Sequence, residues 1–414
     1  MAFPDDSERK CKVTIDAANI DASLSGFPIQ ILLADVPTDM MDGGIFSCLN
    51  GGGDIRAGNA DGTTRYPLEV VRCVTSATPA SRELELHVNV TDTISSSSDT
   101  DVWLYYKEAG ATQPAANSTY GSESVWDSNF ILVSHDGGAT NSTSNADPTA
   151  YGTEPSSTSG KEPGTLARDY NNHEDDDGYT LTISHSAVKT FEVLHYSEGS
   201  VTDFNSMLMA THNAGITEYH AMAQGSSGDF FTFEETFTDF TTGGTATVNT
   251  WQMISARFDG TTAVELYVDG ASVDTNTSPT SNASQTVLDL GVGYDAENAC
   301  EGLMAEMRYS DIDRGDAWIL ATQEMIWDHA NFYNHTPVSE ATEITRDQKA
   351  FRFYDDGTEA GAVALAAQNV DINIGKQTTF QITIGMQTTG DTPSEDVTLQ
   401  YRLAGSSQAW KDVD

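Results

Sequence analysis

The chain has 414 residues, of which 62 are acidic and 20 are basic, and its formal net charge is −42. A field of this sign repels nucleic acids and anionic membranes, so we expect no nucleic-acid partner, and the acidic surface suits a salty medium that screens self-repulsion. No run of residues reaches the roughly 18 to 20 apolar residues of a membrane helix, and the first residues lack the apolar core of a secretory signal. Neither membrane insertion nor signal-dependent export is therefore expected.

Residues 1–135 contain short segments in which apolar and polar residues alternate, such as FPIQILLADV and RELELHVNV, separated by turns rich in Gly, Asp and Ser. Alternation with period 2 and regularly spaced turns predict an antiparallel β-sandwich domain. Residues 136–178 are poor in apolar residues and dense in Gly, Ser, Thr and Pro. Their composition fits either a flexible linker or a long surface loop that begins the next domain.

Residues 179–332 return to strand patterns and predict a jelly roll. The stretch TVNTWQMISARFDGTTAVELYVDGASV contains two apolar runs, followed by the pairs Asp259-Gly260 and Asp269-Gly270. Because Gly tolerates positive φ, these pairs predict tight hairpins whose Trp and aliphatic side chains lie between two sheets. Residues 315–331 place apolar side chains at steps of three and four, which predicts one amphipathic helix packed on the sandwich.

Residues 347–414 predict a small β module of four or five strands. That number is small for a closed sandwich, so we expect an open edge that a partner chain completes by strand addition. The predicted fold class is therefore all-β, with tandem β-sandwich and jelly-roll domains and one short helix near residues 315–331.

The cysteines of the chain are Cys11, Cys48, Cys73 and Cys300. They form no CxxC pair and no zinc-binding set with histidine, so we expect buried free thiols, with a Cys48–Cys73 disulfide as the alternative. The chain lacks the GxSxG, HExxH and P-loop motifs, so no catalytic residue and no cofactor is assigned.

One acidic run, HEDDDG, supplies candidate calcium ligands. The candidates are Glu174, Asp175, Asp176 and Asp177. Calcium takes six to eight oxygen ligands, and three of these carboxylates could reach one ion. The run lacks the DxDxDG alternation of a known calcium loop, so an acidic loop that simply faces solvent is the alternative.

Histidines also occur in the predicted strands of the jelly roll. They are His185, His195, His212 and His220. Their spacing does not force them onto one face, so we expect ordinary core or surface histidines rather than a metal-binding set.

A glycosidase needs two carboxylates about 5 to 9 Å apart across the sugar. The segment FTFEETFTDF holds Glu234, Glu235 and Asp239, but Glu234 and Glu235 would point to opposite faces of a strand. We therefore expect a protein without enzymatic activity.

Two further patterns have both a functional and a structural interpretation. Arg314-Gly315-Asp316 spells RGD but falls at the start of the predicted helix, where Asp316 would cap the helix. Aromatic residues between 219 and 240 could form a platform for sugar rings, although alternate ones must lie in the core. These aromatic residues are Tyr219, Phe230, Phe231, Phe233, Phe237 and Phe240.

The pieces GFPIQILL, DIRAGNADGTTRYPLEV, DVWLYYKEAG and SVWDSNFILVSH resemble an uncharacterised β domain that heads many phage and bacterial surface proteins. The residues at its motif positions are Asp54, Ile55, Arg56, Asp61, Gly62, Tyr105, Tyr106, Trp126 and Asp127. The hairpin TWQMISARFDG…VELYVDG and the segment RYSDIDRGDAWILA are similar to the central hairpin and closing helix of laminin-G-like (concanavalin-like) jelly rolls. The segment FRFYDDGTEAGAVALAAQNVDINI resembles a β module of marine phage structural proteins, which usually runs further than it does here.

The resemblance implies a structural protein on the virion exterior of a tailed phage, either a tail fibre or spike or a capsid-decorating protein. It implies other virion proteins as partners, assembly as a homo-oligomer, and binding to host surface glycans. The alternatives from other classes are a polysaccharide-degrading enzyme on a jelly-roll fold and a cellular surface adhesin.

Overall fold

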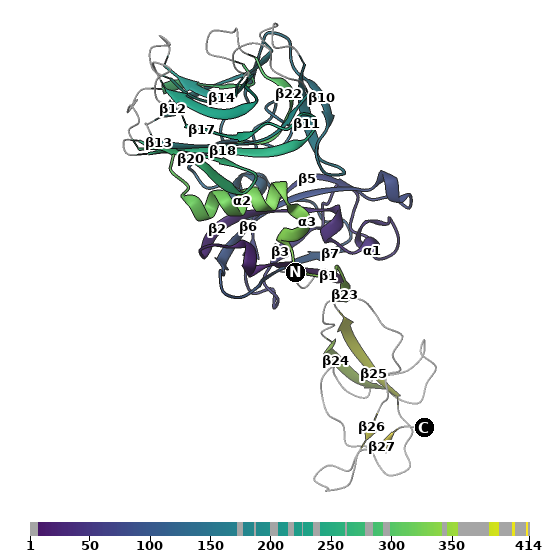
Figure 1. The fold of residues 1–414 in the computed structure, drawn as a ribbon. Helices are drawn as coiled ribbons and strands as arrows, with labels where there is room; N and C mark the ends of the chain where they lie inside the picture. The colour runs from purple at the N-terminus through teal and green to yellow at the C-terminus, as the bar shows by residue number, and fades with distance from the viewer. Residues whose placement is uncertain are drawn as a thin grey trace. The chain divides into compact units, whose positions relative to one another are not determined.

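The computed structural model describes most of residues 7–341 and four short segments beyond them (Figure 1). The described residues are 7–171, 177–185, 188–198, 206–213, 219–225, 227–234, 241–260, 263–277, 285–292, 299–341, 346–354, 381–388, 400–401 and 411–412. The chain divides into two compact units, Lys10–Glu340 and a second that combines Met1–Arg9 with Ala341–Asp414. In the second unit, β24 (Arg346–Tyr354) pairs with β25 (Gln381–Thr388), and β26 (Gln400–Tyr401) pairs with β27 (Lys411–Asp412).

The larger unit begins with a first sandwich of two antiparallel sheets. One sheet has the strand order β23-β1-β7-β3-β4 and the other β2-β6-β5. The strands are β1 (Arg9–Ile15), β2 (Leu24–Leu32), β3 (Arg56–Gly58), β4 (Arg65–Tyr66), β5 (Leu68–Val74), β6 (Glu83–Ile94), β7 (Thr100–Tyr106) and β23 (Ser339–Ala341). Short helical turns connect them: η1 (Ala17–Asn19), η2 (Leu33–Asp35), α1 (Thr38–Met41), η3 (Pro79–Ser81) and η4 (Ser122–Val125).

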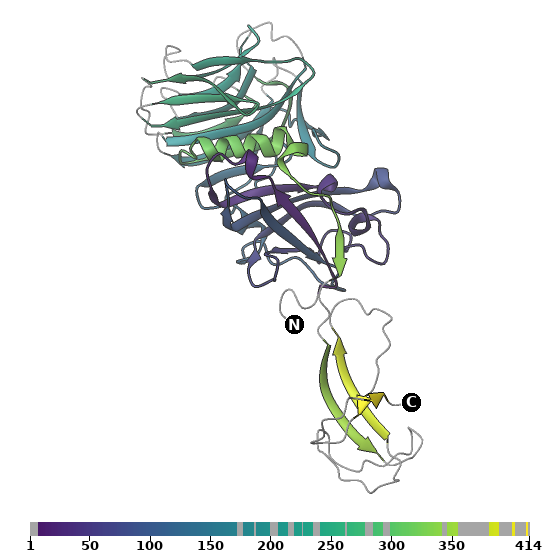
Figure 2. The same cartoon turned by 60° about the horizontal axis from the view of Figure 1, so that its bottom comes forward.

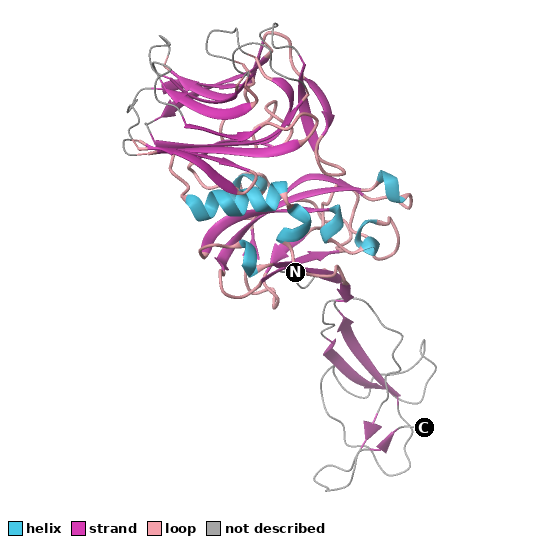
Figure 3. Ribbon diagram, in the orientation of Figure 1, coloured by secondary structure: helices cyan, strands magenta, loops and turns pink. Residues whose placement is uncertain are grey.

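A second sandwich follows, also antiparallel. Its larger sheet has the order β10-β11-β22-β13-β18-β19-β20, with β8 paired to β22, and its other sheet has the order β17-β16-β15-β14-β21-β12-β9. The strands of the larger sheet are β8 (Phe130–Ser134), β10 (Ser156–Ser159), β11 (Leu166–Asn171), β13 (Val188–Ser197), β18 (Trp251–Asp259), β19 (Val264–Val268), β20 (Ala271–Asn276) and β22 (Glu301–Ser310). Those of the seven-stranded sheet are β9 (Thr149–Tyr151), β12 (Gly178–His185), β14 (Ser206–His212), β15 (Tyr219–Gln224), β16 (Asp229–Glu234), β17 (Thr241–Thr245) and β21 (Gln285–Leu290). The predicted all-β fold class is thus confirmed (Figure 3).

The central hairpin forms as predicted, but its side chains pack in two different apolar cores. Strands β18 and β19 pair with Ile254 opposite Val268, and the next turn holds Asp269 and Gly270 at φ 48° and 79°. Ile254 lies in the core between the two sheets of the second sandwich. Met253 and Trp251 instead contact the apolar cluster of the first sandwich, so the expectation that Trp251 lies between the sheets is wrong. The strand is buried on both faces, and alternate residues therefore face different neighbours.

Helix α2 (Asp316–Trp327) lies between the two sandwiches in both ribbon views (Figure 2). The helix predicted for residues 315–331 is thereby found, although it ends before Asp328 and a short α3 (His329–Phe332) follows. Ala321 and Met325 join one buried apolar cluster with residues of the first sandwich and with Leu194 of the larger sheet. The two sandwiches therefore share an apolar layer and form one folded unit. No helix among the described residues is both long and apolar enough to cross a membrane.

The segment 136–178 contains strands β9, β10 and β11. The sequence was compatible with either a linker or a surface loop there. Strands β10 and β11 extend the larger sheet, and β9 forms an edge of the seven-stranded sheet. The four cysteines are buried and free, as expected, with the Cys48 and Cys73 Sγ atoms 3.8 Å apart.

A buried ion pair joins α3 to the first sandwich and predicts a pH-dependent stability. His329 Nε2 lies 2.7 Å from Asp35 Oδ2, its Nδ1 contacts the Met325 carbonyl oxygen at 2.8 Å, and its ring packs on Tyr333. Burial alone would lower the pKa of His329, but Asp35, together with Glu162, raises it above its ordinary value.

Because the folded pKa is raised, the stabilisation is fully present below the ordinary histidine pKa of about 6.5 and is lost as the pH rises through the folded value. We expect the difference in unfolding free energy between the wild type and His329→Gln to shrink over that range. Urea titrations of both proteins at a series of pH values measure it, and a difference that grows with pH would contradict the assignment.

Candidate functional site

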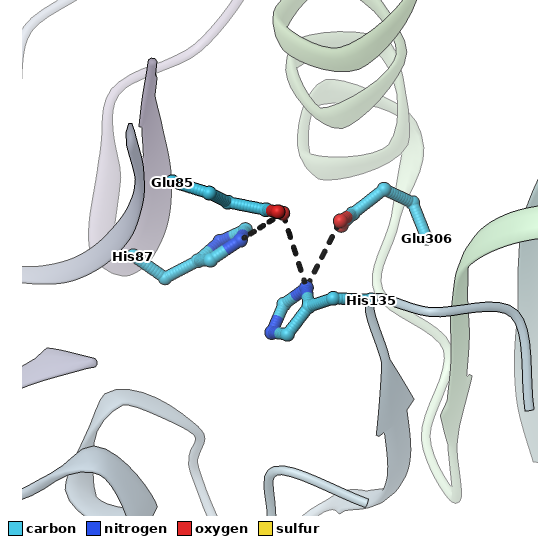
Figure 4. Close-up of side chains that lie close together, drawn as sticks. All are labelled: Glu85, His87, His135 and Glu306. Carbon is cyan, nitrogen blue, oxygen red and sulfur yellow. Dashed lines mark hydrogen bonds and ion pairs between the residues drawn. The ribbon is translucent and has the colours of Figure 1, made fainter. Parts of the chain in front are cut away.

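Two glutamates and two histidines converge where the two sandwiches meet (Figure 4). Glu85 and His87 come from β6, His135 follows β8, and Glu306 lies on β22. One ligand atom from each of these four residues lies within 4.8 Å of the others, and all four side chains are buried. We call these four residues the His/Glu cluster.

The alternation of β6 places two of these side chains. Leu84, Leu86 and Val88 point into the core of the first sandwich, so Glu85 and His87 point to the opposite face. That face of a sheet would normally meet solvent, but both residues are buried because the second sandwich covers them. The polar residues of β6 therefore form a buried polar layer between the sandwiches.

A bulge in β22 delivers the fourth side chain. The register of β22 against β13 shifts between the pairs Glu192–Arg308 and Leu194–Ala305, so β22 carries an extra residue there. Glu306 within this bulge has φ 46°, a left-handed conformation that side-chain-bearing residues rarely adopt. Bulges re-aim side chains, and this one directs the Glu306 carboxylate at His135.

Hydrogen bonds orient the members of the cluster. His135 Nδ1 lies 2.9 Å from Glu306 Oε1 and 3.9 Å from Glu85 Oε1, and His87 Nε2 lies 3.5 Å from Glu85 Oε1. The Gln30 amide donates to Glu85 Oε1 and Glu306 Oε1 at 3.2 and 3.4 Å.

A second layer of partners surrounds the four residues. The Glu69 carboxylate lies 3.5 Å from His135 Nε2 and accepts a 2.8 Å hydrogen bond from the Trp126 indole. Arg308 donates to Glu306 Oε2 at 3.1 Å. The outer carboxylate oxygen of Glu306 is thus hydrogen-bonded, and the outer nitrogen of His135 faces the Glu69 carboxylate at ion-pair distance.

Burial and neighbouring charges shift the pKa values of the cluster in different directions. Burial raises the pKa of Glu85 well above its ordinary value, and the Glu306 carboxylate adds to the effect. Burial would also raise the pKa of Glu306, but His135, His87 and Arg308 outweigh it and lower that pKa. Burial would lower the pKa of His135, but Glu306 and Glu69 raise it well above its ordinary value. The pKa of His87 is lowered, by burial and by the nearby His135.

A cavity of about 480 Å³ opens beside the cluster. Glu85 and His135 line it, together with Glu69, Glu123 and Asp136. Solvent therefore has a route to two of the four residues of the cluster.

A second candidate surface is the outer face of the seven-stranded sheet, which is the face opposite the core of the second sandwich. Tyr179, Leu290, Met209 and Met222 form one row of paired residues and lie in that core. The adjacent row must face the other way, because side chains alternate along each strand. That row consists of Thr149, Thr180, Asp289, Ala210 and Ala221.

The exposed part of the outer face lies at the β9 edge. Tyr151 is 42% exposed and pairs with Gly178. It lies two residues after Thr149 on β9, so its side chain is on the same face of the sheet as the Thr149–Thr180 pair. His212 Nε2 lies 2.8 Å from Asp289 Oδ2 farther across the sheet. Burial would lower the pKa of His212, but Asp289 raises it. At the β9 edge the outer face thus presents the exposed ring of Tyr151 beside the hydroxyl groups of Thr149 and Thr180, whereas the Asp289 carboxylate is buried against His212.

The calcium candidates do not form a described site. Glu174, Asp175 and Asp176 lie outside the described residues. Asp177 accepts a 2.8 Å hydrogen bond from the backbone N–H of Thr153, a residue 24 positions earlier in the chain.

The histidines predicted to be structural have individual partners. His195 contacts the Leu303 carbonyl and Gln224, His212 contacts Asp289, and His220 stacks on Phe258 at 4.7 Å. His185 is described only in its backbone. None of the four belongs to the metal-ligand group found among the described residues.

The remaining sequence candidates divide between core and undescribed residues. Phe230 lies in the main core and Phe231 in a separate cluster with Ala210 and Ala221, so the predicted alternation of these two rings is confirmed. Glu235, Asp239, Phe237 and Phe240 lie outside the described residues, and Tyr219, Phe233 and Glu234 are described only in their backbone.

The RGD tripeptide is part of the packing between the sandwiches. The Arg314 side chain is 3% exposed and forms two hydrogen bonds with Asp127. Gly315 rather than Asp316 is the N-cap residue of α2, so the predicted cap is wrong, but Asp316 does lie in the first turn of the helix, where its charge suits the helix dipole. Asp316 also accepts hydrogen bonds from Arg257 and from the Tyr267 hydroxyl, the latter at 2.7 Å.

Sequence analysis missed the His/Glu cluster entirely. The one signal available was Glu85-x-His87, which places both side chains on one face of a strand. No local sequence pattern indicates that this pair lies near His135 or near Glu306, which is on a strand of the second sandwich.

Residues 190–320 match the laminin-G-like family described as the concanavalin A-like lectin/glucanases superfamily. The second sandwich contains a laminin-G-like domain. No curated protein sequence matches the chain.

The chain is also similar to solved structures at low sequence identity. Domain 4 of AbnA, a GH43 extracellular arabinanase from Geobacillus stearothermophilus solved with arabinotriose, is 17% identical, with a TM-score of 0.38 over 47% of this chain and 98% of that one. The Trypanosoma rangeli sialidase is 11% identical, with a TM-score of 0.36 over 58% of this chain and 42% of that one. A heptameric SAP-like pentraxin from Limulus polyphemus is 8% identical, with a TM-score of 0.31 over 51% of this chain and 88% of that one.

Proposed function

We propose that the protein binds carbohydrate, without cleaving it, through the outer face of the seven-stranded sheet beside Tyr151. The observation that carries this proposal is the Thr149–Thr180 pair next to the exposed aromatic ring of Tyr151. Aromatic faces suit the apolar faces of pyranose rings, and threonine hydroxyl groups can hydrogen-bond the sugar hydroxyls. The match of residues 190–320 to a family described by lectins and glucanases supports the same class of ligand.

Replacing Tyr151 with alanine is expected to weaken binding about tenfold, which corresponds to about 1.4 kcal/mol, because the stacking surface is lost. The wild type is first applied to a panel of neutral and acidic polysaccharides, and calorimetry with the best oligosaccharide then compares the variants. Tyr151→Phe should keep most of the affinity because its ring is retained.

Tyr120→Ala is the matched control. Tyr120 is 38% exposed, stacks over Arg65 and lies outside the outer face. Its removal should leave the affinity unchanged. Equal affinities of the wild type and Tyr151→Ala would show that the sugar binds elsewhere.

A hydrolytic enzyme is the alternative function, and one observation favours it. Glu85 and Glu306 converge near a cavity with pKa values shifted in opposite directions, a pattern found in acid–base pairs. Sustained release of reducing ends from a bound polysaccharide would establish the enzyme, and its abolition in Glu85→Gln would place the activity at the cluster. We expect no release.

The biological setting that we propose is the exterior of a tailed-phage virion, as a tail fibre, spike or capsid-decorating protein. The resemblance of the N-terminal residues and of the last β module to phage proteins supports it. In that setting other virion proteins and sister copies anchor the chain, and several copies raise weak affinity for a host glycan by avidity. A cellular surface adhesin remains the alternative, and immunogold labelling of virions from the host separates the two.

A further inference from the structure

We propose that the His/Glu cluster is a binding site for a zinc-class divalent metal ion that joins the two sandwiches. The proposed ligand atoms are His87 Nε2, His135 Nδ1 and one oxygen each of Glu85 and Glu306. The site is independent of the sugar-binding face, and its test does not depend on any glycan.

The distances within the cluster fit a tetrahedral ion. Zinc lies about 2.0 to 2.1 Å from imidazole nitrogen and carboxylate oxygen, so neighbouring ligand atoms are about 3.3 Å apart around it. Three nitrogen–oxygen distances in the cluster are 2.9, 3.5 and 3.9 Å, and all four ligand atoms lie within 4.8 Å of one another. Small side-chain adjustments would bring them to that value. Two imidazoles and two carboxylates are also a ligand set that zinc commonly accepts.

The partners behind the ligands match those of metal sites. A histidine that binds metal commonly directs its other ring nitrogen at a carboxylate, which fixes the orientation of the ring. His135 does so, with Nε2 at 3.5 Å from Glu69, and Glu69 is in turn held by the Trp126 indole. Gln30 contacts both ligand carboxylates, and Arg308 holds the outer oxygen of Glu306.

Charge balance also favours a divalent ion. The carboxylates of Glu69, Glu85 and Glu306 each lie close to His87 or His135, and Arg308 donates a hydrogen bond to Glu306. Carboxylates gathered in a buried place are costly unless positive charge lies among them. A divalent cation held by neutral imidazoles supplies that charge. The adjacent cavity, lined by Glu85 and His135, gives the ion an entry path.

The ligands come from both sandwiches, which determines what the ion would do. Glu85 and His87 belong to the first sandwich and Glu306 to the second, so a bound ion crosslinks them. An ion that binds only the folded protein raises its stability, and the gain grows with the logarithm of the free ion concentration once that concentration exceeds Kd.

The test uses the full chain after exhaustive chelation and dialysis. Calorimetry with zinc chloride should show one ion per chain, and zinc should raise the melting temperature by several degrees. Cobalt(II) should give the intense visible absorption of a tetrahedral site, which an adventitious octahedral surface site does not give. Absence of stoichiometric binding, or a weak octahedral cobalt spectrum, would overturn the proposal.

Variants locate the ion. Glu306→Gln and Glu85→Gln keep the side-chain shape and remove one ligand charge each, so each should weaken zinc binding at least tenfold and reduce the thermal shift. His335→Gln, a half-buried histidine outside the cluster, is the matched control and should bind zinc as the wild type does. Unchanged zinc affinity in both cluster variants would assign the ion elsewhere and overturn the proposal. If one variant fails to fold, the other and the wild-type cobalt spectrum still decide it.

Discussion

Replacing Phe27 with alanine is expected to lower the free energy of unfolding by about 3 to 5 kcal/mol, the usual cost of removing a fully buried phenylalanine. Phe27 is 0% exposed on β2, and its ring meets that of Trp318 on α2 edge to face at 4.9 Å. The lost ring leaves a cavity in the apolar layer that both sandwiches share. Both sandwiches should therefore lose stability together.

Urea unfolding followed by tryptophan fluorescence and by far-UV circular dichroism measures this effect. Residues 10–340 should unfold in one transition, and both signals should shift by the same amount in the variant. Phe46→Ala is the control, since Phe46 is 37% exposed and its removal should cost less than about 1 kcal/mol. Two separate transitions, with only one affected by Phe27→Ala, would show that the sandwiches fold independently.

Replacing Arg314 with alanine is the second large effect that we expect, at about 2 to 4 kcal/mol of unfolding free energy. Its guanidinium forms two hydrogen bonds with Asp127, at 2.6 and 2.9 Å, and lies 3.9 Å from the ring centre of Phe130. Burial would raise the pKa of Asp127, but Arg314 lowers it. The loss should stay below the highest values for buried pairs because the Asp127 side chain is 39% exposed and water can solvate it.

Arg314→Lys separates charge from geometry. Lysine keeps the positive charge but cannot form the bidentate contact or stack in the same way, so we expect an intermediate loss. Lys12→Ala is the control, because the Lys12–Asp101 pair is exposed and should contribute less than about 1 kcal/mol. Equal effects of Arg314→Ala and Lys12→Ala, measured by urea titration, would contradict the structural role of Arg314.

The sequence motifs that carried the resemblance are largely structural. Trp126 and Asp127 come from the first resembling region, and Arg314 and Trp318 from the helix segment of the laminin-G-like region. In the structure Asp127 binds Arg314, whose guanidinium also lies over Trp318. Asp54, another motif residue, is buried and accepts hydrogen bonds from the backbone N–H groups of Leu49 and Lys107. The residues of these motifs therefore form contacts within the first sandwich and between the two sandwiches.

Strands with an apolar alternation could be predicted from the sequence, and edge strands could not. The hairpin that begins at Trp251 was correctly predicted because its apolar residues and Asp-Gly turns are local signals. Strands β9 and β10, TAY and SSTS, have almost entirely exposed side chains and pair through their backbones. No apolar pattern marks such strands, and the exposed Tyr151 was therefore placed in a linker or loop.

The candidate sites depend on contacts that no local pattern encodes. The outer face requires the register of five strands, and the His/Glu cluster requires a bulge at Glu306 and the packing of one sandwich on another. A single sequence specifies these features only through the complete fold.

The most direct test of carbohydrate binding is a crystal structure of the protein with the oligosaccharide that binds best in the polysaccharide panel. We predict an intact sugar ring stacked on Tyr151, with its hydroxyl groups hydrogen-bonded to Thr149 or Thr180. A sugar bound instead in the cavity beside Glu85 and His135, or one that has been cleaved, would contradict the proposed function.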